Sequence, residues 1–411
     1  MALRKRLRRT IATVVGASVG VQLLTAGVVS VVASLHRRQR KPSGFPYLEP
    51  MSDEVAGNEV TVYTYGTHLY EEMLAEIERA SDYIYFESFI WKSDEIGQEF
   101  KDALIRAAER GVRVCCTWDV FANIVVPRSF FNFPPIVRTY PYPLLKGGIK
   151  FLSLKHSGRD HRKILVIDGN VGFVGGYNIG SNYANKWRDT HARVRGPLVT
   201  ELESAFVDMW NWGAGHPRDL LPEPTCQAWT AEIRTHCNTP QTMTYPIRNM
   251  YLEAIRKASS RVWLTQAYFI PDDDVQIALL EAVERGVDVS VVIPEESNHV
   301  MADWLSRARY ETLLEGGVKI FLYQKAMIHS KTAVIDSVWS TIGTANLDSL
   351  SLLGNYEINL EVFDRSLAST MEDVFTMDLT NCRELSLEEW TQRPFYARLA
   401  ERILRPLSII M

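Results

Sequence analysis

The chain has 411 residues, of which 46% are hydrophobic and 23% are charged, and its formal net charge is −4. This composition is typical of globular proteins and excludes a disordered chain, a collagen-like repeat and a small disulfide-framed domain. The length allows about two or three domains, and the charge gives no support to a general nucleic-acid-binding protein.

The first 41 residues differ in charge from the rest of the chain. They contain nine basic residues and no acidic residue, so residues 42–411 carry a net charge of −13. Residues 10–35 contain no charged side chain, and a helix of that length can cross a hydrocarbon core of about 30 Å. A cleaved signal peptide usually has a shorter apolar run. We therefore expect a single-pass anchor in the cell membrane rather than a signal peptide or a buried soluble helix.

The flanks of this anchor leave its orientation open, because five basic residues precede it and four follow it. The five cysteines form no CxxC pair. The adjacent Cys115 and Cys116 cannot bond each other without strain. Reduced thiols favour a cytoplasmic location for the body of the protein.

After residue 60, helical and strand-like patterns alternate, and the same series occurs twice. The first half predicts a helix over 72–80, a strand over 83–91, a helix over 97–110 and a strand over 112–121. The second half predicts a helix over 252–258, a strand over 261–270, a helix over 275–285 and a strand over 287–294. We expect an α/β fold with two similar domains, each a mixed sheet flanked by helices.

The segments between these patterns set the expected domain boundaries. Residues 214–246 contain five prolines and little periodicity, which is typical of a connection between domains. The expected division is an anchor and linker over 1–60, a first domain over 61–215, a connecting segment over 216–245, a second domain over 246–385 and a tail over 386–411. The tail mixes arginine with apolar residues, so it either lies in a membrane interface or packs on the body of the protein.

Each half contains one HxKxxxxD motif, followed by a glycine-containing stretch that ends in asparagine and then by a carboxylate. The five matching positions recur at an offset of 168 residues. They are His161, Lys163, Asp168, Asn178 and Asp189 in the first half, and His329, Lys331, Asp336, Asn346 and Glu357 in the second. One such motif is a weak signal, but two copies with matching partners predict a shared site between the halves.

The residue types in these motifs suit phosphate chemistry. In a strand, positions i and i+2 face the same side, so each histidine projects beside its lysine. Two lysines and the amides of Asn178 and Asn346 would stabilise a phosphate whose charge grows in the transition state. Two histidines suit a two-step displacement, in which one attacks phosphorus and the other protonates the leaving alcohol and later deprotonates the incoming one.

The acidic residues of the motifs divide into two groups. Asp189 and Glu357 are candidates for orienting the histidines through the far ring nitrogen. Asp168 and Asp336 are kept with the catalytic motif, although a position at the end of a strand more often caps a turn. The chemistry needs no metal or other cofactor, and no His/Cys cluster has the spacing of zinc ligands.

At these residues the sequence resembles the phospholipase D superfamily and, within it, the bacterial cardiolipin synthases. The resemblance covers roughly residues 60–385, including the segments HRKILVIDGNVGFVGGYNIG, WRDTHARVRGP and HSKTAVID. It implies two similar α/β domains with the site between them, and a phosphohistidine intermediate. It also implies transfer of a phosphatidyl group between two phosphatidylglycerol molecules, which gives cardiolipin and glycerol. One departure is Gly176, where many members have serine.

The expected partners are the membrane and a phospholipid substrate, with no nucleic acid. Alternatives are a hydrolytic phospholipase D or another phosphatidyltransferase, a nuclease-type phosphodiesterase, and an inactive lipid-binding scaffold. The −13 charge of the body disfavours the nuclease, and the intact histidines disfavour the scaffold. The symmetric motifs leave open which histidine attacks first, with a slight preference for His161, and the sequence leaves the second substrate and the oligomeric state open.

Overall fold

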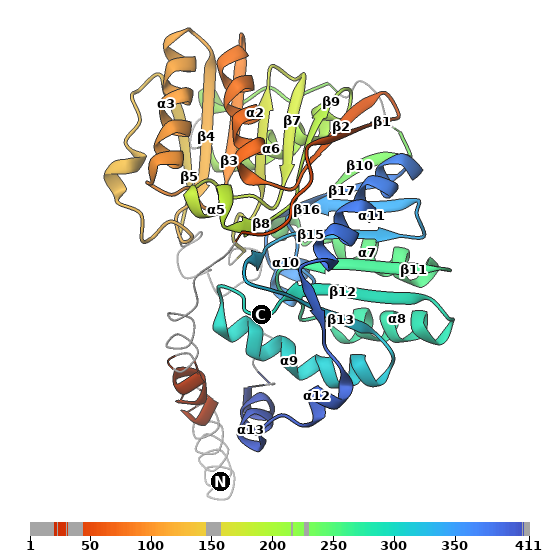
Figure 1. The fold of residues 1–411 in the computed structure, drawn as a ribbon. Helices are drawn as coiled ribbons and strands as arrows, with labels where there is room; N and C mark the ends of the chain where they lie inside the picture. Colours follow the sequence, from red (N-terminus) through yellow and green to blue (C-terminus); the bar gives the residue numbers. More distant parts are fainter. Residues whose placement is uncertain are drawn as a thin grey trace, which may run out of the picture.

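A computed structural model of the protein describes residues 20–22, 24–29, 31, 44–144, 158–214, 217–225, 230–404 and 406. Its body contains two eight-stranded mixed sheets, as predicted (Figure 1). The first sheet has the order β1 (Met51–Val55), β2 (Asn58–Tyr63), β9 (His191–Arg195), β7 (Val171–Gly175), β6 (Lys163–Ile167), β3 (Tyr83–Ser88), β4 (Arg113–Asp119), β5 (Val137–Tyr142). The second has the order β10 (Ile233–Asn238), β17 (Glu357–Phe363), β16 (Trp339–Gly343), β15 (Lys331–Ile335), β11 (Arg261–Gln266), β12 (Asp288–Pro294), β13 (Lys319–Tyr323), β18 (Cys382–Glu384).

The six strands from β9 to β5 and from β17 to β13 occupy matching places in the two sheets. In each sheet a central parallel pair, β3–β4 or β11–β12, is followed by an antiparallel partner that begins at the lysine of the motif. The repeat seen in the sequence is therefore a repeat of the fold.

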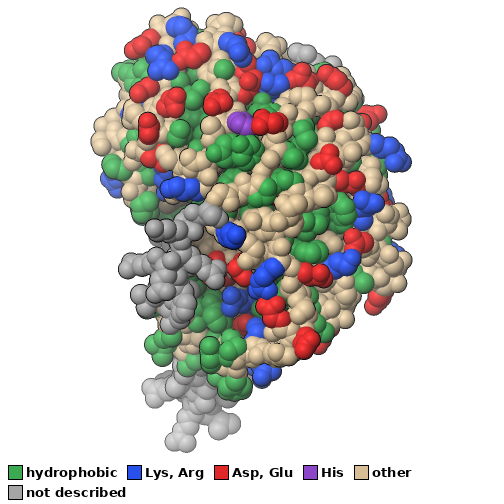
Figure 2. All heavy atoms as spheres, viewed as in Figure 1, with side chains coloured by type: hydrophobic (Ala, Val, Ile, Leu, Met, Phe, Trp, Pro, Cys, Tyr) green, Lys and Arg blue, Asp and Glu red, His purple; other side chains and the backbone are tan. Residues whose placement is uncertain are grey.

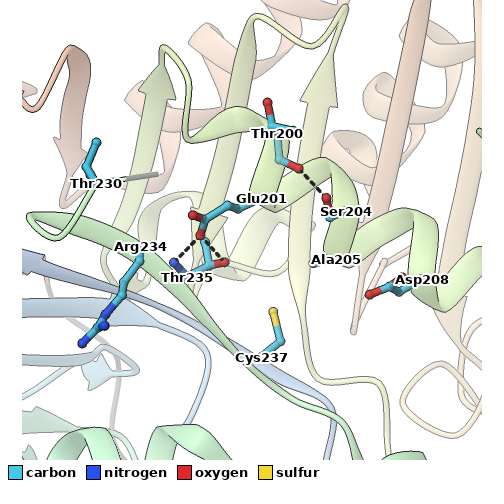
Figure 3. A pocket seen from close by; sticks show the side chains of 9 residues that line it. All are labelled: Thr200, Glu201, Ser204, Ala205, Asp208, Thr230, Arg234, Thr235 and Cys237. Atoms are coloured by element: carbon cyan, nitrogen blue, oxygen red, sulfur yellow. Dashed lines mark hydrogen bonds between the residues drawn. The ribbon is translucent and has the colours of Figure 1, made fainter. Parts of the chain in front are cut away.

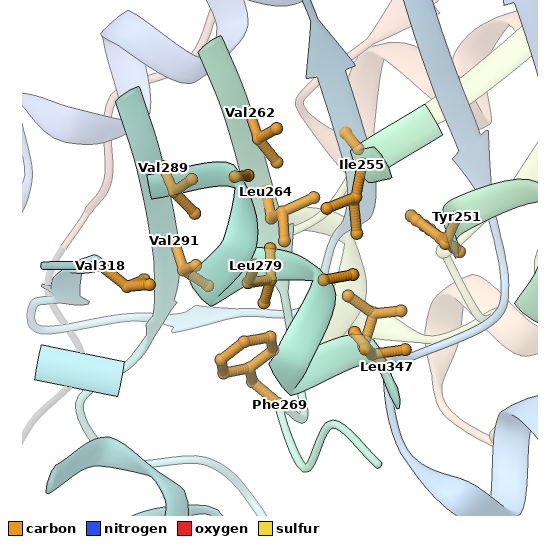
Figure 4. Close-up of a cluster of buried hydrophobic side chains, with 14 of the residues drawn as sticks. Tyr251, Ile255, Val262, Leu264, Phe269, Leu279, Val289, Val291, Val318 and Leu347 are labelled. Carbon is orange, nitrogen blue, oxygen red and sulfur yellow. The ribbon is translucent and has the colours of Figure 1, made fainter. Parts of the chain in front are cut away.

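Helices cover the sheets and connect their strands. They are α2 (Gly66–Arg79), α3 (Glu95–Glu109), α5 (Ser181–Asn185), α6 (Val199–Gly213), α7 (Pro246–Lys257), α8 (Asp273–Glu284), α9 (Val300–Glu315), α10 (Ser349–Leu353), α11 (Arg365–Leu379), α12 (Leu387–Thr391) and α13 (Phe395–Leu404). Residues of α2 and α3 share one core with the outer face of the first sheet. Residues of α7 and α8 do so for the second sheet, as Figure 4 shows for part of that core. A third core lies between the halves and includes α6, α11 and both inner sheet faces.

The helix boundaries follow local chemistry. Asp94 caps α3 by accepting a bond of 3.1 Å from Gly97 N, and Asp272 caps α8 in the same way at 2.9 Å from Val275 N. Both helices are followed by a glycine with positive φ, Gly111 at 96° and Gly286 at 87°, a conformation that glycine adopts at little cost. The predicted helices over 97–110 and 275–285 are thus confirmed, with shifted starts.

Two segments expected to connect domains contain strands of the sheets. The predicted linker over 42–60 contains β1 and part of β2, a hairpin that pairs with β9 and so belongs to the first sheet. The predicted connecting segment over 216–245 contains β10, which forms the edge of the second sheet beside β17. Strands β1 and β10 are short and polar on one side, so the continuous apolar patterns that predict core strands did not indicate them.

The sequence predicts a membrane anchor near the N-terminal end and leaves two placements open for the C-terminal tail, a membrane interface or the body of the protein. In the described part of the chain, no helix combines the length and apolar character needed for a membrane span. The predicted anchor over 10–35 falls mostly outside the described residues. At the other end, α13 packs on α9, with Leu404 buried beside Ala302 and Leu305.

Candidate functional site

The two halves are joined by backbone hydrogen bonds at the start of each motif. His161 N donates to Tyr356 O at 3.0 Å, and His329 N donates to Arg188 O at 2.6 Å. A two-stranded parallel ladder of β8 (Trp187–Arg188) and β14 (Met327–Ile328) extends the second contact. Because Arg188 and Tyr356 are 168 residues apart, the two contacts are equivalent in the repeat. The backbone N–H of each motif histidine is therefore hydrogen-bonded to the half that does not carry it.

The side chains of the histidines are also paired across the halves. His161 Nδ1 lies 2.8 Å from Glu357 Oε2, and His329 Nδ1 lies 2.7 Å from Asp189 Oδ2. Both carboxylates are fully buried, and both imidazoles are nearly so. A carboxylate at Nδ1 fixes the tautomer that leaves a lone pair on Nε2 for attack or proton transfer. The site thus contains two oriented imidazoles, each completed by the half that does not carry it.

Both motif lysines are buried within this cluster. The amino groups of Lys163 and Lys331 donate to the carbonyls of His161 and His329, respectively. Burial lowers the pKa of Lys163 to about 7 and that of Lys331 to about 8, although Glu357 and Asp189 oppose the decrease. A bound anion would stabilise the charged form of both amines, so the two lysines are suited to bind a phosphate.

The two histidine–carboxylate pairs differ in charge. Burial and the nearby lysines lower the pKa of His161 well below its ordinary value and that of His329 to about 3, so both rings are neutral at pH 7. Burial alone would raise the pKa of Asp189, but Lys331 and the bond to His329 lower it overall. Burial raises the pKa of Glu357 to about 8. Asp189 is therefore the ionised partner and Glu357 the more easily protonated one.

The two asparagines lie in the same buried region with different contacts. Asn178 Oδ1 accepts a bond of 3.0 Å from Ile90 N, so its amide hydrogens are not used in this bond. Asn346 Oδ1 is buried and has no hydrogen-bond partner among the described residues. Such an atom usually meets water or a ligand, so Asn346 is positioned for a polar group that enters the site.

The glycines before these asparagines make room for the opposite strand. A Cβ at Gly176 would lie 2.1 Å from Asp189 Oδ1, and one at Gly343 would lie 2.3 Å from the Asn359 side chain. The departure at Gly176 thus has a steric cause, because the Asp189 carboxylate occupies the space of a side chain there.

The motif aspartates are not part of this cluster. Asp168 has φ of 52° and accepts bonds of 2.8–2.9 Å from Ser81 N, Ser81 Oγ, Asp82 N and Tyr83 N. Asp336 has φ of 53° and makes the equivalent bonds to Ser259, Ser260 and Arg261. Both lie at the far end of a core strand, about 16 Å from the lysine. The structure thus places both aspartates at the turn that starts the neighbouring strand, away from the histidines.

Several residues support the site, of which the sequence pointed to Arg188 beside Asp189 but not to Asp378, Phe89 or Trp187. The Arg188 guanidinium makes two bonds of 2.9 Å to Asp378 on α11, a buried ion pair that ties β8 to the second domain. Phe89 packs on the His161 ring at 4.7 Å, and Trp187 on the His329 ring at 5.4 Å. Asp378 has no counterpart at the repeat offset, so no sequence signal pointed to it.

Other features of the described residues are separate from this cluster. No group of three or more metal-binding side chains occurs within the described ranges. A cavity of about 470 Å³ lies between α6 and β10, as Figure 3 shows. It is lined by Glu201, Asp208, Arg234 and several small residues, and by no residue of either motif.

Two oriented histidines and two lysines, contributed by equivalent α/β halves, define the class of phospholipase D-like proteins. Residues 73–210 and 251–379 match the family model described as cardiolipin synthase, PLD-like domain. The chain is 32% identical over 368 residues to a cardiolipin synthase of Clostridium perfringens, covering 86% of this chain and 77% of the relative. It is 33% identical over 375 residues to cardiolipin synthase A of Pseudomonas putida, covering 87% and 76%. The chain belongs to this cardiolipin synthase family of phospholipase D-like proteins.

The fold is also similar to that of a solved structure. The phosphatidylserine synthase of Haemophilus influenzae superposes with a TM-score of 0.66 at 14% identity, covering 88% of this chain and 95% of that one. At this identity the similarity concerns the fold alone.

Proposed function

We propose that the protein is a membrane-bound phosphatidyltransferase that makes cardiolipin and glycerol from two phosphatidylglycerol molecules. The observation that carries the proposal is the crossed pairing of His161 with Glu357 and of His329 with Asp189. The cardiolipin synthases similar to this chain over 86–87% of its length support the transfer reaction and the phospholipid substrate.

In the first step, Nε2 of one histidine attacks the phosphorus of phosphatidylglycerol. A P–N bond forms and the P–O bond to glycerol breaks, while the second histidine donates a proton to the leaving oxygen. Lys163 and Lys331 would neutralise the growing charge on the phosphoryl oxygens, and Asn178 and Asn346 would donate amide hydrogens to them. The carboxylate behind the attacking ring stabilises the cationic phosphohistidine that results.

In the second step, the glycerol hydroxyl of another phosphatidylglycerol replaces the leaving alcohol. The second histidine removes its proton as the oxygen attacks phosphorus, and the P–N bond breaks. Without substrate both rings are neutral at pH 7 because of burial, and the anionic phosphodiester favours the protonated form of the second ring when it binds. The second ring then gives its Nε2 proton to the leaving glycerol, becomes neutral, and is protonated again by the acceptor hydroxyl, so it ends the cycle as it began.

The proposal includes an arrangement on the membrane. Residues 10–35 form its single-pass anchor, the first domain covers residues 51–215 and the second residues 230–385. The body faces the cytoplasm, where phosphatidylglycerol of the inner leaflet is available.

The test is incubation of the full chain in vesicles with isotope-labelled phosphatidylglycerol, followed by mass spectrometry. We expect cardiolipin and glycerol in equal amounts. Phosphatidic acid without cardiolipin would contradict transfer and identify a hydrolase with the same site. The H161A/H329A double variant provides the blank for both products.

A further inference from the structure

The segment that follows β4 exposes apolar side chains at the end of the sheet that carries the site. Ile124 and Val125 are 68% and 77% exposed, and Phe121 beside them is also exposed. Large aliphatic side chains that are this exposed and adjacent usually mark a contact surface. The start of the segment is held in place, because Phe121 N and Ala122 N both donate to Asp119 Oδ1, at 2.8 and 3.1 Å.

This segment is fixed to the wall of the site. Asn123 Nδ2 donates to Phe89 O at 2.8 Å, and Asn123 Oδ1 accepts from Trp91 N at 2.8 Å. The Phe89 ring lies edge-on to the His161 ring, with centroids 4.7 Å apart. The exposed pair Ile124 and Val125 is thus linked to the His161 ring through Asn123 and Phe89.

A second exposed apolar surface lies on α13 and is linked to the other histidine, His329, through Tyr268. Phe395 and Tyr396 on α13 are 72% and 73% exposed, and Arg398 and Arg402 are exposed on the same helix. The inner face of α13 packs through Leu404 into a cluster that also contacts Tyr268. Tyr268 lies edge-on to the His329 ring, with centroids 6.3 Å apart.

Figure 1 shows the segment after β4 and helix α13 on the left and lower-left side of the molecule. In Figure 2, hydrophobic side chains gather at the lower end of this side, where α13 lies. We call the residues Phe121, Ile124, Val125, Phe395, Tyr396 and Leu399 the apolar rim.

We infer that the apolar rim docks on a phospholipid bilayer and holds the entrance of the site at the level of the headgroups, which rests on the proposed function. Aromatic and aliphatic side chains with neighbouring arginines are the composition of interfacial segments, in which the rings lie among the headgroups and the cations meet anionic lipid. Arg398 and Arg402 on α13 complement the anionic headgroup of phosphatidylglycerol, the substrate of the proposed function, and this charge complementarity favours a bilayer as the occupant. A bilayer also contacts both parts of the rim at once.

The first test measures insertion directly. The full chain carrying Ile124→Cys is labelled with an environment-sensitive fluorophore and reconstituted into vesicles that contain brominated phosphatidylglycerol. We expect quenching at position 124 and none for the same label at Ile277→Cys, a half-exposed residue on α8. The labelled parent chain gives the background from native cysteines. Absence of quenching at 124 would overturn the inference, and shielding without lipid would identify a protein contact instead.

The second test separates docking from chemistry. The I124S/V125S variant is compared with I136S/I277S, a control with two half-exposed isoleucines away from the site entrance. We expect the rim variant to lose about tenfold in rate on vesicles but to match the parent on a short-chain phosphatidylglycerol below its micelle concentration. Equal losses on both substrates would instead make the segment a scaffold of the site. If the parent makes no cardiolipin while position 124 is quenched, the proposed function fails and the docking surface stands.

Discussion

The Thr344 hydroxyl donates a hydrogen bond of 2.6 Å to Glu357 Oε2. The equivalent position in the first half is Gly176, so Asp189 receives no such bond. The bond lowers the pKa of Glu357 against the larger effect of burial. We predict that Thr344→Val reduces kcat about tenfold, because a buried carboxylate loses a charge-assisted bond. Thr344→Ser should retain most activity, and equal kcat in all three proteins would contradict a role for this hydroxyl.

Gly176 cannot carry a side chain without moving Asp189. A Cβ there would lie 2.1 Å from Asp189 Oδ1, whereas a Cβ at Gly44 would meet nothing within 4 Å. We predict that Gly176→Ala lowers kcat at least about a hundredfold, because displacement of the carboxylate disturbs His329. Gly44→Ala should be active. Steady-state kinetics on vesicles, with circular dichroism to verify folding, decide the matter, and an active Gly176→Ala enzyme would show that the carboxylate can relocate.

Each motif histidine should be indispensable. His161→Ala and His329→Ala should each abolish cardiolipin formation, since one ring forms the covalent bond and the other transfers protons. His236 offers a matched control, because its Nε2 lies 2.7 Å from Glu361 in a pair outside the site. His236→Ala should retain turnover. Substantial activity in either motif variant would refute the shared site, and acid-labile phosphate trapped on His161 or His329 identifies the nucleophile.

The lysines predict a falling limb in the pH profile. Burial lowers the pKa of Lys163 to about 7 and that of Lys331 to about 8, so these amines lose their charge as the pH rises through that range. The substrate phosphodiester remains anionic, and kcat/KM should therefore decline between about pH 7 and 8. Lys163→Arg keeps its charge at every pH tested, so any activity it retains should decline at higher pH than in the parent. A flat parent profile to pH 9 would contradict charged lysines as the phosphate site.

The motif aspartates should affect stability rather than chemistry. Although burial opposes it, hydrogen bonds from Ser81, Asp82 and Tyr83 lower the pKa of Asp168. The ionised carboxylate thus stabilises the fold above its ordinary pKa near 4, and this contribution is lost as the pH falls. We predict a lower Tm for Asp168→Asn at pH 7, with a smaller difference from the parent below about pH 4. Its kcat per folded molecule should equal that of the parent; a selective loss of kcat would return Asp168 to the site.

Much of this site follows from the repeat in the sequence. Continuous apolar runs after each HxK motif predict buried strands, and β6 and β15 are buried on both faces. The identical spacing to Asp189 and Glu357 predicts partners for the histidines. The spacing could not show that the pairs cross between halves, because sequence distance within one half says nothing about contacts to the other.

Two features of the structure could not be predicted from the sequence patterns: the position of the motif aspartates and one buried ion pair. Asp168 and Asp336 belong to the same motif as the histidines, but an extended strand carries them away from the site. The Arg188–Asp378 pair joins residues 190 positions apart and occurs once, so neither periodicity nor repetition marks it.

The crossed backbone contacts of His161 with Tyr356 and of His329 with Arg188 restrict how the molecule can move. A hinge that spread the two domains apart would break both contacts, and with them both histidine–carboxylate pairs, in a single motion. Lipid headgroups must therefore enter and leave while the domains stay closed.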